Sequence, residues 1–177
     1  MRIHRTRGLL TVAAAGILTL GIAIPASAVG TTATVTVTGG ALSISAPTDA
    51  GNLGSRANTV LAGTISGSLG QVRVDDARSA AAGSGWVASV ISTAFTPSAG
   101  PTIGAAAIGY TAGPITKVGT ATFTANDPPD LTGAVAAVTA TGITGDNSAT
   151  WNPTINVTVA GGKAAGVYSA TITHSVA

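Results

Sequence analysis

Apolar residues alternate with small polar residues along most of this chain, at the spacing of two that is typical of β-strands. Val35 and Val37 alternate with threonines, and Ile155, Val157 and Val159 share one face of a later stretch. Gly, Pro, Asn and Asp occupy the gaps, as they do in turns. The pattern predicts strands around residues 35–37 and 72–74, and over residues 41–46, 60–69, 86–96, 103–110, 120–125, 135–143, 150–159 and 167–176.

Helices are disfavoured because Gly and the β-branched residues Thr, Val and Ile dominate the composition, and these are poor helix formers. Only a short Ala-rich turn near residues 131–137 has any helical character. About nine or ten short strands with frequent turns indicate an all-β fold, a sandwich or a barrel. We predict an antiparallel β-sandwich of the immunoglobulin-like or Greek-key type. A low-complexity stalk is the alternative, and the persistent alternation argues against it.

One stretch concentrates the distinctive residues of the chain. Val72 and Val74 alternate with polar residues, a small-residue segment follows over residues 77–85, and a second apolar run starts at Trp86. This order predicts a β-hairpin with Asp76, Arg78 and Trp86 gathered at its loop end. Residues two apart on a strand share a face, so Asp76 and Arg78 can form an ion pair there.

Residues 1–28 have the three regions of a secretory signal peptide. Three arginines precede an apolar run over residues 9–24, and Pro25-Ala26-Ser27-Ala28 provides small residues for cleavage. We predict cleavage after Ala28 and a single mature domain over residues 29–177, without a membrane span. An uncleaved anchor is the alternative, but the apolar run is short for one.

The predicted cleavage changes the charge of the chain. The mature protein keeps five basic residues against six aspartates and no glutamate, so its net charge is near −1. No basic cluster remains to follow a phosphate backbone, which argues against nucleic-acid binding. The chain has no cysteine, so burial and β-ladders must stabilise it without disulfides.

Several short motifs, in order, resemble one family of surface proteins. The entering strand reads Leu42-Ser43-Ile44-Ser45-Ala46-Pro47, the central one has Asp76-x-Arg78 followed by Gly85-Trp86, and the last reads Gly166-Val167-Tyr168-Ser169-Ala170-Thr171-Ile172-Thr173. Together with Trp151-Asn152-Pro153, they resemble the WxL-type domains of Gram-positive bacteria, in their actinobacterial form. The tryptophan of the family motif lies here in Trp86-Val87-Ala88. The resemblance implies a secreted protein that associates non-covalently with the peptidoglycan of the cell wall.

A search for catalytic or metal-binding groups finds few candidates. The mature chain has one histidine, His174, and no cysteine, whereas a zinc site usually needs three or four ligands. Asp75 and Asp76 are neighbours on a strand and point to opposite faces, so they cannot act as the carboxylate pair of a glycosidase. The polar turns at residues 126–130 and 146–147 could offer oxygen ligands to calcium, but without a recognisable loop spacing. We therefore expect no enzymatic activity and no cofactor.

Four residues are candidates for binding: Asp76, Arg78, Trp86 and Trp151. They could form a recognition patch for a wall glycan, with the tryptophan rings exposed. The alternative is that the ion pair fixes the hairpin and the rings fill a core poor in aromatics. The predicted partners are peptidoglycan or another wall glycan, with other exported surface proteins second. In that second case, the chain is an assembly subunit that pairs through a sheet edge.

Overall fold

The computed structural model describes residues 30–177, and residues 37–177 form one compact unit. The predicted signal peptide and its cleavage site lie outside the described residues. Ten strands run through this part of the chain, and its only helical element is a 3-10 turn at Ala105–Ala107. The strands are β1 Leu42–Ser45, β2 Gly63–Ser68, β3 Val72–Ser92, β4 Thr96–Pro97, β5 Ile108–Thr111, β6 Ile115–Ala125, β7 Val135–Trp151, β8 Thr154–Val159, β9 Tyr168–Ser169 and β10 Ile172–Val176.

The main sheet is antiparallel and has the order β1-β3-β7-β6, with β10 also paired to β3. Strand β3 pairs with β7 along nearly its whole length, from Val72 opposite Trp151 to Val90 opposite Val135. On the other side of β3, β1 pairs with residues 73–76 and β10 pairs with residues 88–92. The long strands β3 and β7 therefore connect two sets of shorter neighbours.

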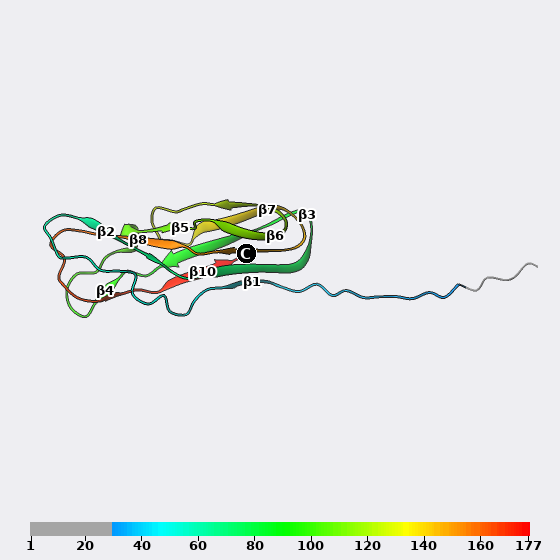
Figure 1. The fold of residues 1–177 in the computed structure, drawn as a ribbon, viewed down its shortest axis with the longest axis horizontal. Helices are drawn as coiled ribbons and strands as arrows, with labels where there is room; N and C mark the ends of the chain where they lie inside the picture. Colours follow the sequence, from blue (N-terminus) through cyan, green and yellow to red (C-terminus); the bar gives the residue numbers. More distant parts are fainter. Residues whose placement is uncertain (1–29) are drawn as a thin grey trace, which may run out of the picture. The chain divides into compact units, whose positions relative to one another are not determined.

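This sheet folds back over itself and so makes both layers of a sandwich. Trp86 lies opposite Ala140 in the ladder, seven residues from Asn147 along β7. In a straight strand that separation would be about 23 Å. The indole Nε1 of Trp86 is nevertheless 3.0 Å from the side-chain oxygen of Asn147. The ribbon of β3 and β7 must bend between these pairs, and Figure 1 shows β3 turning back near its label.

Register irregularities place the bend at the same level in three neighbouring strands. Asp76 pairs with Asn147, and Trp86 pairs with Ala140. Between these two pairs β3 advances by ten residues and β7 by only seven, so β3 has three extra residues there. Strand β6 bends at Gly119, whose φ is +86° and where an added Cβ would lie 2.5 Å from the Asp146 carbonyl oxygen. Extra residues and glycine in the left-handed region allow a paired strand to bend sharply without losing its ladder.

Smaller sheets extend both layers away from the bend. Strands β2, β8 and β5 form a three-stranded sheet in that order, and they are the direct continuations of β3, β7 and β6. Strands β4 and β9 pair in the same way beyond the ends of β3 and β10. Short breaks, such as Asn152-Pro153 between β7 and β8, interrupt the long ladders. Pro lacks the N–H that a central strand needs, which accounts for a break at this point.

The core lies between the two layers and contains mostly Val, Ile, Leu and Ala with a few large rings. Along β3, Val72, Val74, Trp86, Ala88 and Val90 are buried, and the residues between them point outward or are only partly covered. The inner face therefore keeps one alternation through both halves of the bent strand. The largest fully buried rings are the indoles Trp86 and Trp151 and the phenol Tyr110.

The prediction of an all-β antiparallel sandwich is confirmed, and so is the period-two burial. The predicted hairpin is wrong, because residues 72–76 and 86–90 do not pair with each other. Both pair with β7 as parts of a single strand. Sequence alone does not show that a partner strand bends together with β3. The Ala-rich segment near residues 131–137 is not helical, since β7 begins within it.

Two further points concern the ends of the described chain. The strand expected around residues 35–37 forms no ladder in the structure, and Val35 and Val37 are 91% and 87% exposed. Within residues 30–177, no helix has the length and apolar character that a membrane crossing requires.

Candidate functional site

Asp76 and Arg78 form a bidentate ion pair at the bend of β3. The guanidinium donates from Nε to Asp76 Oδ1 at 2.8 Å and from Nη2 to Oδ2 at 3.0 Å. The Arg78 amide also donates to Oδ1, at 3.2 Å. The Asp76 side chain is fully buried, whereas 37% of the Arg78 side chain is exposed. The carboxylate therefore lies inside the sandwich, and the guanidinium covers it from the surface.

Asn147 and Trp86 continue this pair into a chain of hydrogen bonds across the two layers. The Asn147 amide nitrogen donates to Asp76 Oδ2 at 3.1 Å, and its oxygen accepts from Trp86 Nε1 at 3.0 Å. A further bond runs from Arg78 Nη2 to the Gly85 carbonyl oxygen at 3.2 Å. We call Arg78, Asp76, Asn147 and Trp86 the bend network. It links the part of β3 before the bend to the part after it.

The bend network stabilises the ionised form of the Asp76 carboxylate. Hydrogen bonds from Arg78 hold the pKa of Asp76 below its ordinary value, with Asn147 adding to the effect, although burial acts in the opposite direction. The same interaction raises the pKa of Arg78. A buried charge is tolerated only when it is paired and hydrogen-bonded, and Asp76 meets both conditions.

A second chain of hydrogen bonds surrounds Trp151. Its indole N–H donates to the Tyr110 hydroxyl at 2.7 Å, and that hydroxyl lies 3.2 Å from His174 Nε2. When Nε2 of the neutral imidazole is unprotonated, the tyrosine O–H can donate to it, so the indole N–H, the hydroxyl and Nε2 are all hydrogen-bonded. We call Trp151, Tyr110 and His174 the Trp151 chain. It joins β7, β5 and β10.

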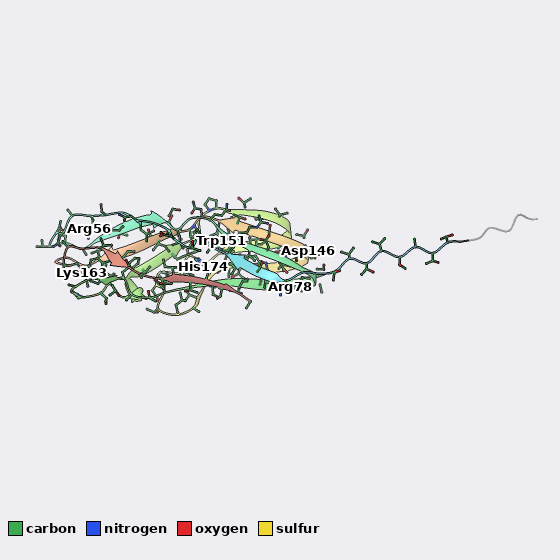
Figure 2. All side chains as sticks on the ribbon, turned by 90° about the horizontal axis from the view of Figure 1, so that it is seen from below. Arg56, Arg78, Asp146, Trp151, Lys163 and His174 are labelled. Carbon is green, nitrogen blue, oxygen red and sulfur yellow. The ribbon has the colours of Figure 1, made fainter. Side chains whose placement is uncertain are left out.

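Burial determines how the Trp151 chain titrates. It lowers the pKa of His174 to about 4 and raises the pKa of Tyr110 above its ordinary value. His174 is therefore neutral at physiological pH and can accept the hydrogen bond from Tyr110. Figure 2 shows Trp151 and His174 in the middle of the sandwich, and Arg78 near Asp146 at the end with the bend.

The four residues predicted as a binding patch fall into these two groups. Asp76, Arg78 and Trp86 lie together in the bend network, whereas Trp151 belongs to the other chain. Both indoles are only 2% exposed, so neither ring offers a face to a ligand in this conformation. The geometry agrees with the alternative reading, in which the pair and the rings hold the fold together.

Sequence reasoning missed Asn147 and Tyr110 as partners of the two tryptophans. Asn147 lies two residues before Ala149 and four before Trp151, so on one strand the three side chains share a face, and both later residues are buried. This spacing could have indicated that Asn147 points into the core. An inward-pointing amide needs a partner, and a buried indole N–H is a fitting one.

The outer surface carries two features that the sequence did not single out. The first is a shallow hollow of about 530 Å³ over β8 and β5, lined by Thr64, Ala106, Ala107, Gly109, Pro129, Asn156 and Thr158. Asn156 is held there between the hydroxyls of Ser66 at 2.7 Å and Thr111 at 3.3 Å. The second is the edge of β6, which in the described chain pairs only with β7.

Over residues 30–177, no three His, Cys, Asp or Glu side chains gather where they could hold a metal ion. The site candidates thus define an all-β sandwich with two internal hydrogen-bond chains, an open polar hollow and a free strand edge. No family model, no curated protein and no solved structure matches this chain.

Proposed function

We propose that this protein is a non-catalytic, exported surface protein that acts as a structural subunit and joins other proteins through the edge of its sheet. The observation that carries the proposal is the free edge of β6. This strand has 11 residues and lies last in the order β1-β3-β7-β6. An edge of this kind presents unpaired backbone groups to an added strand.

The two halves of β6 differ in how open they are to such pairing. The first half carries Lys117 and ends at the bend around Gly119, and both features discourage strand addition. The second half, residues 120–125, has no charge and reads Thr-Ala-Thr-Phe-Thr-Ala. Its register with β7 is regular from Thr122 onward. We call residues 120–125 the open edge, and it is the surface that the proposed function uses.

Lysine substitutions on the open edge test this function. The variant T122K/T124K places two lysines on the open edge in place of exposed threonines. Charged side chains there should block the addition of a strand, while the fold is kept because both positions face solvent. Cells carrying the variant should release it as free monomer, whereas the wild-type protein should remain in assemblies on the cell surface. The matched control is T141K, because Thr141 is exposed opposite Thr122 but lies on the inner strand β7. Equal retention of all three proteins would refute the proposal.

Association with the cell wall is the second candidate, and the resemblance to WxL-type domains implies it. The hollow around Asn156 supports it, because amide and hydroxyl groups beside small apolar surfaces can bind sugar hydroxyls. Most cationic groups are already engaged, which leaves little charge for anionic wall polymers. Arg73 and Arg78 are in ion pairs, and Arg56 and Lys163 bond backbone oxygens.

A pull-down on purified sacculi tests this candidate. Binding through sugar hydroxyls should persist at about 0.5 M salt, where the Debye length is only a few ångströms. It should also fall in N156A but not in T141K, which lies away from the hollow. Loss of binding with salt, or after removal of anionic polymers from the sacculi, would contradict this mechanism.

A further inference from the structure

Residues 32–38 have the sequence of a strand but pair with no strand of the described chain, residues 30–177. They read Thr-Ala-Thr-Val-Thr-Val-Thr, with alternating threonines and small apolar residues and with no charge. In the described chain they form no ladder, and Val35 and Val37 are nearly fully exposed. An uncharged segment of this pattern and high β-propensity is suited to pair with an open sheet edge. We call residues 32–38 the donor segment.

The donor segment repeats the pattern of the open edge almost residue for residue. Residues 32–37 read Thr-Ala-Thr-Val-Thr-Val, and residues 120–125 read Thr-Ala-Thr-Phe-Thr-Ala. Both alternations place threonines on one face and apolar residues on the other. A strand added in this register would set its threonines beside Thr122 and Thr124, and its valines beside Ala121 and Phe123 on the core side.

The backbone of the open edge is oriented to accept such a strand. The Asn126 amide donates to the Ala137 carbonyl oxygen at 3.0 Å, so backbone groups at this position point toward β7. Because the direction alternates along a strand, Thr122 and Thr124 also point toward β7. Ala121, Phe123 and Ala125 then present their N–H and C=O groups to the free side. The open edge thus offers three pairs of backbone groups.

The path of the chain disfavours pairing of the donor segment with its own open edge. The segment ends at Gly39-Gly40, and the Gly40 amide bonds the Ala77 carbonyl oxygen, beside β1. From β1 to β6 the sheet order crosses three strand spacings, about 14 Å, and the open edge lies beyond the bend, because its regular part pairs with residues 138–141 of β7 whereas β1 lies at the level of residues 147–150. At least about four residues of extended chain would be needed to cover that distance, leaving about three at most to pair. A second molecule can offer its edge to the whole segment.

We infer that the donor segment of one copy adds as a strand to the open edge of a second copy, so that the protein assembles head to tail. The inference rests on the proposed function, because it uses the same edge and names its partner. The contact is heterologous, since a donor segment meets an edge and not another donor segment. Each assembly still has one free donor segment at one end and one free open edge at the other, so it grows as a chain.

Light scattering on size-fractionated protein starting at residue 29 tests the inference. The wild-type chain should form oligomers that grow with concentration, and V35K should be monomeric because lysine would enter the apolar face of the added strand. The matched control V60K changes a valine that is equally exposed, at 92%, outside the donor segment. V60K should assemble like the wild type. A wild-type chain that stays monomeric at every concentration would overturn the inference.

Disulfide cross-linking tests which two surfaces meet. Because the chain has no cysteine, only the introduced cysteines can form a disulfide. T34C/T122C should give covalent ladders on oxidation, because the threonine rows of donor segment and open edge adjoin. T34C/T173C, with the second cysteine on an exposed threonine of β10, should not. A disulfide within single molecules of T34C/T122C would show that the segment closes on its own edge, and would overturn the inference.

The variants also separate the failure of the inference from the failure of the proposed function. If T122K/T124K abolishes assembly while V35K leaves it unchanged, the open edge is used but the donor is another segment, and only the inference falls. If neither variant changes the assembly, both the inference and the proposed function are refuted. Loss of assembly in both variants, with V60K and T141K unaffected, supports both.

Discussion

Two arginine–aspartate pairs lie side by side on β3 and have opposite surroundings. Arg73 bonds Asp75 and Arg78 bonds Asp76, and in each pair the residues are two positions apart. Half of the Arg73 side chain and 45% of the Asp75 side chain are exposed, whereas the Asp76 side chain is fully buried. The same chemistry at the same spacing thus forms a surface pair and a core pair.

The difference comes from the alternation of the strand. Asp75 and Asp76 are neighbours, so their side chains point to opposite faces, and only Asp76 points between the layers. An exposed pair of this kind contributes little to stability, because water and ions screen it. A buried carboxylate needs hydrogen bonds to both of its oxygens. Besides the Arg78 guanidinium, the Asn147 side chain donates to Asp76 Oδ2 and the Arg78 amide donates to Oδ1. The inner pair therefore supports the bend of the sheet.

The largest expected effect comes from the rings at the ends of the two hydrogen-bond chains. Trp86→Ala and Trp151→Ala should each lower the free energy of unfolding by about 3–5 kcal/mol, because each leaves a cavity in a core poor in aromatics. Denaturant unfolding monitored by circular dichroism measures this loss. Unchanged stability with loss of binding to sacculi would show that the rings serve a ligand instead.

The comparison of the two carboxylates is sharpened by replacing each with the isosteric amide. Asp76→Asn should destabilise the protein by about 1–3 kcal/mol, since it removes the charge that Arg78 and Asn147 bond. Asp75→Asn should leave the unfolding midpoint unchanged within error, because its pair is exposed. Equal effects of the two substitutions would show that the bend network adds nothing beyond a surface pair.

Sequence reasoning predicted the chemistry of the inner pair but not its setting. The spacing of Asp76 and Arg78 was enough to predict their contact, and period-two burial was enough to predict a sandwich. The predicted hairpin failed because residues 77–85 look like a turn, whereas β7 bends with them and keeps both halves in one ladder. Whether a small-residue segment is a turn or a bend depends on a strand about 60 residues further along the chain, which local patterns do not show.

The pH dependence of stability separates the two hydrogen-bond chains. Burial lowers the pKa of His174 to about 4, so its contribution is complete above its unfolded value of about 6.5 and is lost as the pH falls toward 4. The expected loss is on the order of 1–3 kcal/mol. The pKa of Asp76 is also lowered, but from 3.8, so its contribution is lost only below that pH.

Chemical denaturation between pH 7 and pH 4 measures the effect of His174. His174→Gln keeps an acceptor for the Tyr110 hydroxyl but cannot ionise, so its stability should be nearly constant over this range. Below pH 3.8 the wild type and the variant should both lose further stability, because both contain Asp76. A wild-type protein as stable at pH 4 as at pH 7 would contradict the burial argument for His174.

The smallest expected effect concerns salt, and it tests directly why the two pairs differ. Ions screen exposed charges strongly, and at about 0.5 M salt they screen them beyond a few ångströms. The loss of stability caused by Asp76→Asn should therefore be nearly the same at low salt and at 0.5 M salt, because Asp76 is shielded from solvent by Arg78 and the sheet. Any small effect of Asp75→Asn at low salt should vanish at 0.5 M. If instead salt removes the effect of Asp76→Asn, the carboxylate is reached by solvent, and the buried setting of the inner pair does not hold in solution.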